Sequence, residues 1–238
     1  GIMPLASVTR EFQTGDSQKL KRTVEAVLRI TFLTALPMGV GISVLAQPAA
    51  RLIYGARPGT VIVGRVLTIL GAASVFAALC GPLNSILQAM GHVELPVVLT
   101  LIGLFVKAVL DYTLAAVPRV NVLGGAVGTL VCYALASVLA CIAIRRIAGV
   151  KIDFFSTFKK PFLASVCCGV AALLTHKAWC AVLPESRFSA LPAVFLGALI
   201  YVVFLLIARG ICEEDIKALP NGEKITKRLE KYLQKAGG

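Results

Sequence analysis

The chain has 238 residues, of which 58% are hydrophobic and 15% charged, and its mean hydropathy is +0.85. This composition lies far outside that of soluble globular domains and indicates an integral membrane protein. The net charge of +12 would favour nucleic-acid binding in a soluble domain. Here most basic residues flank long apolar runs, so the charge is a topology signal. We predict an all-α, polytopic transmembrane bundle with about six spans.

The N-terminal part, residues 1–23, is expected to hold a cytoplasmic loop and the end of a preceding helix. The chain begins with Gly and shows no cleavable signal peptide, so we expect a fragment that lacks an N-terminal part. Gly15 predicts a turn, and a helix begins near Gln18. It leads into the first span at 30–45, where Pro37 is expected to kink it.

A short connector at 49–60 precedes the remaining apolar runs, which predict spans at 65–90, 95–117, 122–144, 161–183 and 188–212. The chain therefore divides into four transmembrane helices within 24–144, a basic cytoplasmic loop at 145–160, two additional transmembrane helices within 161–212, and a cytoplasmic amphipathic tail at 213–238.

The distribution of Lys and Arg predicts the orientation of the spans. With the N-terminal segment on the cytoplasmic side, sixteen basic residues fall on that side and six on the other. Cytoplasmic loops are enriched in Lys and Arg, so this imbalance predicts six spans with both ends of the chain cytoplasmic.

The span at 95–117 carries Lys107 and Asp111 near its middle. Each charge costs about 2.5 to 3.5 kcal/mol at the centre of a membrane helix. The two residues are four apart, so ammonium and carboxylate share one helix face and can pair. Two interpretations stay open: a cavity-lining pair that meets an anionic substrate group or couples to a cation, and a structural ion pair that fixes helix packing.

Polar residues also occur in the preceding span, where Asn84 and Gln88 follow Pro82. Hydrogen bonding between helices and lining of the cavity are both possible roles for the two amides. We expect the 95–117 span to face this polar cluster, so that its charges avoid lipid.

Two further features concern the first and fourth spans. Glu25 and Arg29 are one turn apart where the first span enters the membrane, and predict an interfacial pair or a role in gating or lipid-headgroup contact. Gly124 and Gly128 form a small-residue ridge that favours close helix packing.

The sequence offers no nucleophile with a base partner, no phosphate-binding loop and no cluster of metal ligands, which argues against an enzyme. We expect no cofactor and no metal. The cysteines form no CxxC pair, and the five within apolar runs are predicted to be free thiols. Polar groups and helix breakers inside spans are instead typical of transporters.

Several stretches of the chain resemble the C-terminal portion of polysaccharide-biosynthesis exporters related to stage V sporulation protein B and the lipid II flippases. These belong to the multidrug/oligosaccharidyl-lipid/polysaccharide (MOP) exporter superfamily. The resembling stretches are MPLASVTREFQTGDSQKLKRTVEAVLRITFLTALPMGVGISVLAQP, PLNSILQAMGHVELPV, GLFVKAVLDYTLAAVP, VNVLGGAVGTLVCYAL and EEDIKALPNGEKITKRLEKY.

The resemblance implies a C-terminal fragment of a fourteen-helix, MATE-like transporter with two lobes, working by alternating access. It also implies a flippase for a lipid-linked oligosaccharide, such as the lipid II-like peptidoglycan precursor of cell-wall or spore-cortex synthesis. The expected partners are this substrate, membrane lipids and a coupling cation, without nucleic acid. The alternatives are a polysaccharide repeat-unit exporter, a multidrug or cation antiporter, and a membrane scaffold for cell-wall assembly that transports nothing.

Overall fold

The computed structural model describes residues 3–15, 17–55, 57–117 and 121–149, together with 161–163, 165–167, 169–170 and 173–175. Within these ranges the regular structure is entirely helical. Four of the helices are long and apolar enough to cross a membrane, which confirms the predicted polytopic, all-α class.

The N-terminal segment, in which a loop and the end of a preceding helix were expected, is mostly helical among its described residues. Helix α1 (Met3–Gln13) is followed by a turn at Gly15, whose φ of 69° lies in the left-handed region. Helix α2 (Ser17–Val44) then begins within one residue of the predicted start at Gln18. The loop prediction failed because α1 has an apolar face that becomes buried: Val8 packs with Leu20 in the core. Helix α2 continues through Pro37.

The predicted connector at 49–60 is also partly helical. Helix α3 (Ala46–Tyr54) occupies its first half and ends at Gly55, whose φ is 71°. The small side chains Ala46 and Ala50 are both buried. The glycines and proline that follow correctly indicate a turn but gave no sign of this short helix before it.

The next three helices agree with the predicted spans to within a few residues. They are α4 (Thr60–Ala89), α5 (Glu94–Ala115) and α6 (Asn121–Ala148). Gly91, with a φ of 88°, lies in the tight turn between α4 and α5. Helix α6 is longer than predicted, so Arg145 and Arg146 lie in its last turn and not in the following loop.

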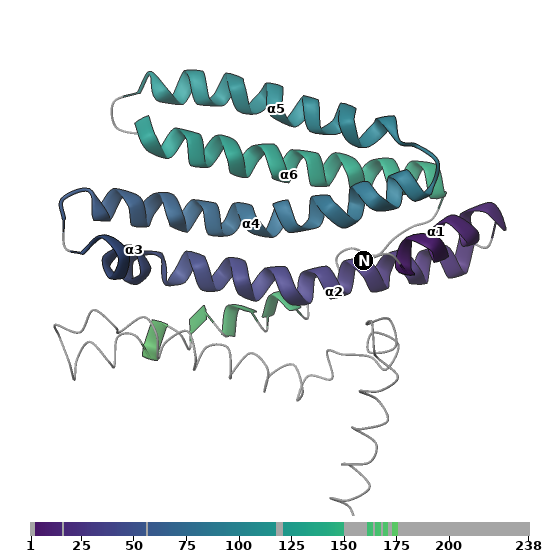
Figure 1. Cartoon of the computed structure of the whole chain (residues 1–238), viewed down its shortest axis with the longest axis horizontal. Helices are drawn as coiled ribbons and strands as arrows, with labels where there is room; N and C mark the ends of the chain where they lie inside the picture. The colour runs from purple at the N-terminus through teal and green to yellow at the C-terminus, as the bar shows by residue number, and fades with distance from the viewer. Residues whose placement is uncertain are drawn as a thin grey trace, which may run out of the picture.

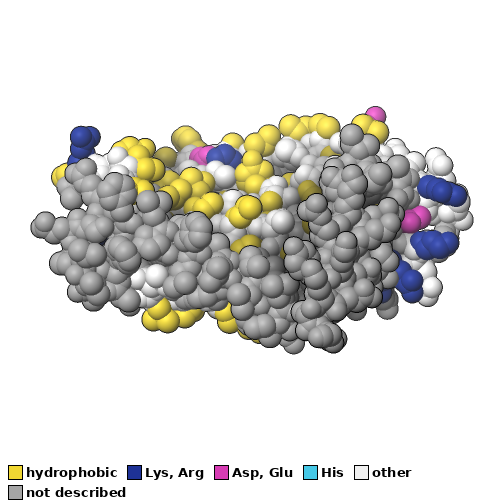
Figure 2. All heavy atoms as spheres, turned by 60° about the horizontal axis from the view of Figure 1, so that its bottom comes forward, with side chains coloured by type: hydrophobic (Ala, Val, Ile, Leu, Met, Phe, Trp, Pro, Cys, Tyr) yellow, Lys and Arg dark blue, Asp and Glu magenta, His cyan; other side chains and the backbone are white. Residues whose placement is uncertain are grey.

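The four long helices lie side by side in the order α2, α4, α6, α5 (Figure 1). Helix α5 is therefore at one edge and packs mainly on α6, although it follows α4 in the chain. Only Pro96 and Gly103 of α5 are buried. Many exposed side chains of the described part are hydrophobic, and most of its visible charged side chains gather at one end (Figure 2).

The main hydrophobic core lies at the end of the bundle where α1 packs against α2 and α4. Leu28 of α2, Leu83 and Leu87 of α4 and Ile144 of α6 are almost completely inaccessible there. Burial of such side chains stabilises the fold by about 1.5 to 3 kcal/mol each in water, and by packing rather than water exclusion inside the bilayer.

Short helical pieces between residues 161 and 175 run beside α2 (Figure 1). A Cβ on Gly169 would meet Val40 of α2, so this segment packs closely on that helix. The remainder of the predicted fifth span, the sixth span at 188–212 and the tail at 213–238 lie outside the described residues.

Candidate functional site

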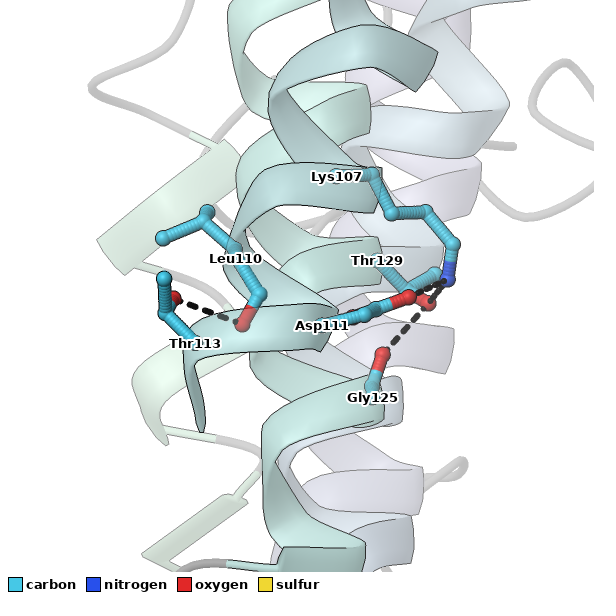
Figure 3. Close-up of polar contacts among 6 residues, drawn as sticks. All are labelled: Lys107, Leu110, Asp111, Thr113, Gly125 and Thr129. Atoms are coloured by element: carbon cyan, nitrogen blue, oxygen red, sulfur yellow. Dashed lines mark hydrogen bonds and ion pairs between the residues drawn. The ribbon is translucent and has the colours of Figure 1, made fainter. Parts of the chain in front are cut away.

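Lys107 and Asp111 form an ion pair on α5, as their spacing predicts. Lys107 Nζ lies 3.2 Å from Asp111 Oδ2, and the two side chains are 30% and 36% exposed (Figure 3). Acidic and basic side chains can be seen together within the hydrophobic belt of the molecule (Figure 2). The pair is thus partly accessible and still inside a span.

Helix α6 supplies a further partner that the sequence did not suggest. Lys107 Nζ donates a hydrogen bond of 2.9 Å to Thr129 Oγ1, and Thr129 Oγ1 donates in turn to the Gly125 carbonyl at 2.8 Å (Figure 3). The ammonium is therefore held between a carboxylate on its own helix and a hydroxyl on the next. Charge-assisted hydrogen bonds of this kind are the stronger ones.

Gly128 of α6 makes room for the carboxylate. A Cβ at position 128 would collide with Asp111 Oδ1, so only glycine fits against this side chain without displacing it. Gly124, one turn away, also lies close to α5: a Cβ there would be 2.8 Å from Leu114 Cβ. The predicted close-packing ridge on α6 is thereby confirmed.

The second carboxylate oxygen has no partner among the described residues. Asp111 Oδ1 is inaccessible yet accepts no hydrogen bond there, whereas Oδ2 faces Lys107. An uncompensated acceptor in a medium of low polarity is costly. Asp111 therefore keeps an acceptor position that its ion pair with Lys107 does not fill.

Asn84 and Gln88 do not join this site. They lie in the last two turns of α4, whereas Lys107 lies about three and a half turns beyond the start of α5. The expectation that the charged helix faces these amides was wrong, because α6 lies between α4 and most of α5. Within the described residues, neither amide forms a side-chain hydrogen bond to another helix.

Glu25 and Arg29 lie on α2, at the same end of the bundle as α1. Glu25 Oε1 is 3.7 Å from Lys21 Nζ, one turn earlier in the helix. Glu25 therefore has a basic neighbour on the N-terminal side. The pairing of Glu25 with Arg29 and a role in gating stay predictions.

The described residues contain no group of three His, Cys, Asp or Glu side chains that could hold a metal ion. The four cysteines that the structure describes are free, as predicted. Cys80 Sγ lies 3.3 Å from Ser137 Oγ between α4 and α6. The Cys80 thiol thus takes part in the contact between α4 and α6.

The comparisons with known proteins agree with this architecture. The family described as "Lipid II flippase MurJ" matches residues 2–202. Stage V sporulation protein B of Bacillus subtilis (strain 168) is 23% identical over 209 residues, which are 85% of this chain and 38% of that protein. The uncharacterized membrane protein YabM of the same organism is 22% identical over 230 residues, or 92% and 41%.

The chain thus spans about two fifths of the length of the curated relatives that it matches. The matched family consists of flippases and not of enzymes, in agreement with the prediction from the sequence. Since the family match covers most of the chain, including both helices of the Lys107 site, the protein is a multi-pass membrane protein that belongs to the lipid II flippase MurJ family.

Proposed function

We propose that the chain forms part of a flippase that moves a lipid-linked oligosaccharide, a peptidoglycan precursor of the lipid II type, across the bacterial plasma membrane. The family match and the sporulation-protein relative support this substrate class. The observation that carries the proposal is the partly exposed Lys107 ammonium inside a membrane span. Intramembrane ionisable groups typically mark a substrate or ion pathway.

In the proposed mechanism, Lys107 exchanges partners during alternating access. When the cavity is empty, Asp111 and Thr129 hold the ammonium. When the substrate enters, Lys107 turns to its pyrophosphate, and Asp111 requires another positive charge. A coupling cation or proton supplies it, and its release restores the original pair. In this proposal, Asn84 and Gln88 line the same pathway at the level of the last two turns of α4.

The orientation completes the proposal: the N-terminus, α1 and the end of α6 face the cytoplasm, and α3 faces the other side. Basic residues at the α1 end support it. In a cysteine-free full-length protein, Arg10→Cys should resist a membrane-impermeant maleimide in intact cells and react after permeabilisation. Arg57→Cys should react in intact cells. The opposite labelling pattern would reverse the orientation.

The functional test uses the full-length protein in cells depleted of their own lipid II flippase. Lys107→Gln should abolish rescue of growth, because it removes the charge that meets the pyrophosphate, and Lys107→Arg should retain partial rescue. Thr113→Ala is the matched control, because among the described residues this exposed hydroxyl on α5 bonds only to backbone oxygens of its own helix (Figure 3). Full rescue by Lys107→Gln at wild-type membrane levels would contradict the proposal.

A further inference from the structure

Helix α3 lies where two membrane spans end. Its first residue, Ala46, follows the end of α2 at Val44, and its last residue, Tyr54, precedes the start of α4 at Thr60. Both neighbours are candidate spans, so α3 is at the surface of the bilayer and not within it. It lies at the end of the bundle opposite to α1 (Figure 1).

Several contacts fix α3 on the start of α4. Gln47 Nε2 donates a hydrogen bond of 2.9 Å to the Val61 carbonyl, and Gly64 gives the Gln47 side chain the space of a missing Cβ. In the turn that follows, Thr60 Oγ1 donates to the Gly55 carbonyl at 2.9 Å. The outward face of α3 is therefore held in one orientation.

That outward face is apolar and aromatic. Ile53 is 73% exposed and Tyr54 52% exposed, and Val61 and Ile62 in the first turn of α4 are also exposed. Tyrosine at the end of a span is typical of the membrane–water boundary, where its ring lies among the lipids and its hydroxyl reaches the headgroups. These four side chains are therefore suited to contact lipid at the membrane–water boundary.

The same segment carries three arginines: Arg51 in α3, Arg57 in the turn and Arg65 in the second turn of α4. All three are exposed, and among the described residues none has an acidic partner within ion-pair distance. The sequence also contains no Asp or Glu between Glu25 and Glu94. The charges of the three arginines are thus uncompensated by neighbours in the chain.

We propose that α3 and the first two turns of α4 form an anchor that binds the phosphates of acidic phospholipids in the adjacent leaflet. A guanidinium binds phosphate oxygens through two parallel hydrogen bonds, and its position beside exposed apolar side chains lets it reach the headgroup while they contact the acyl chains. The anchor holds the end of α2 and the start of α4 at a fixed depth in the membrane. It is independent of the flippase proposal.

Tryptophan fluorescence in liposomes tests this anchor. The probe is Tyr54→Trp in a full-length protein in which Trp179 and every other native tryptophan are replaced by Phe. The liposomes are phosphatidylcholine with a minor fraction of phosphatidylglycerol. Brominated acyl chains are placed on one lipid or the other. The quenching by brominated phosphatidylglycerol should indicate that this lipid is enriched about fivefold around the probe. An enrichment of this size is expected from the attraction of one arginine for acidic lipid.

Two changes should remove that enrichment. The triple variant Arg51→Gln, Arg57→Gln, Arg65→Gln should leave equal quenching by the two lipids, and so should 1 M NaCl, where charges are screened within about 3 Å. The matched triple variant with Lys at the same positions should keep the enrichment in low salt. Equal quenching in the unmodified anchor, an absence of quenching, or enrichment that survives both changes would overturn the proposal.

Discussion

Two helix seams of this bundle use glycine for different purposes. Between α2 and α4, a Cβ on Gly71 would lie 2.9 Å from the Gly39 carbonyl oxygen, so two backbones touch. The polar group nearby, Ser43 Oγ, donates to the Thr68 carbonyl at 2.9 Å and is satisfied. This seam is a neutral, closely packed contact.

Between α5 and α6, the glycine instead accommodates a charge. Gly128 faces the Asp111 carboxylate, and one of its oxygens is left without a partner among the described residues. Packing alone does not require a charged pair, since apolar side chains of similar volume often stabilise a protein as well or better. The α2–α4 seam is therefore a packing contact, and we propose that the α5–α6 seam retains its costly charged groups for transport.

Gly71→Leu should have the largest effect on folding. Its side chain would meet backbone atoms, including Ser43 N at 2.7 Å from the new Cβ, and backbone cannot move aside. We expect a loss of about 3 kcal/mol in unfolding free energy, measured by thermal unfolding of the full-length protein in detergent. Gly81→Leu is the control, because a Cβ at this position of the same helix meets no described residue within 4 Å. Equal losses would refute the tight α2–α4 seam.

Gly128→Ala should affect transport more than folding. The new Cβ displaces Asp111 Oδ1, which belongs to a side chain that can rotate away, so we expect a loss of about 1 kcal/mol in unfolding free energy. Displacement of the carboxylate breaks its contact with Lys107 and should reduce rescue of flippase-depleted cells. Gly125→Ala, with open space around it, should behave as wild type. Unimpaired rescue by Gly128→Ala would contradict this separation of roles.

Thr129→Val removes the hydroxyl at nearly constant volume. Lys107 then loses its bond to α6, and we expect a decrease of about 0.6 to 1.7 kcal/mol in unfolding free energy. Rescue should weaken but persist, because Asp111 still holds the ammonium. Thr129→Ser should restore both properties. A fully inactive Thr129→Val at normal membrane levels would assign Thr129 a larger role than the one inferred.

Ser43→Ala should have the smallest effect. It removes one neutral hydrogen bond between α2 and α4, for which we expect a loss of about 0.6 kcal/mol in unfolding free energy. Rescue of flippase-depleted cells should be unchanged. A transport defect in this variant would mean that the α2–α4 seam also takes part in the cycle.

The long helices and the Lys107–Asp111 pair could be predicted because hydropathy and residue spacing are local properties of the sequence. The short helices α1 and α3 could not be predicted in this way, because their apolar faces are stabilised by packing against other helices, which a local pattern does not reveal. Thr129 was missed because a threonine in an apolar span commonly bonds to its own helix, as its contact with the Gly125 carbonyl also does.

The neighbour of α5 was predicted wrongly for a related reason. Consecutive helices joined by a tight turn are expected to pack together, and the turn at Gly91 favoured contact between α4 and α5. Helix α6 takes that place instead, because its ridge of small residues lets both neighbours approach, with Gly128 against Asp111 on one side and Ser137 against α4 on the other.

The most direct test of a functional rather than structural pair compares Lys107→Ala with the double variant Lys107→Ala, Asp111→Asn. The single variant leaves a carboxylate unpaired inside a span, which lowers both thermal stability and rescue of flippase-depleted cells. The double variant removes that charge. We predict that it regains the wild-type unfolding temperature but not rescue. Recovery of both would show that the pair serves only to hold α5 on α6.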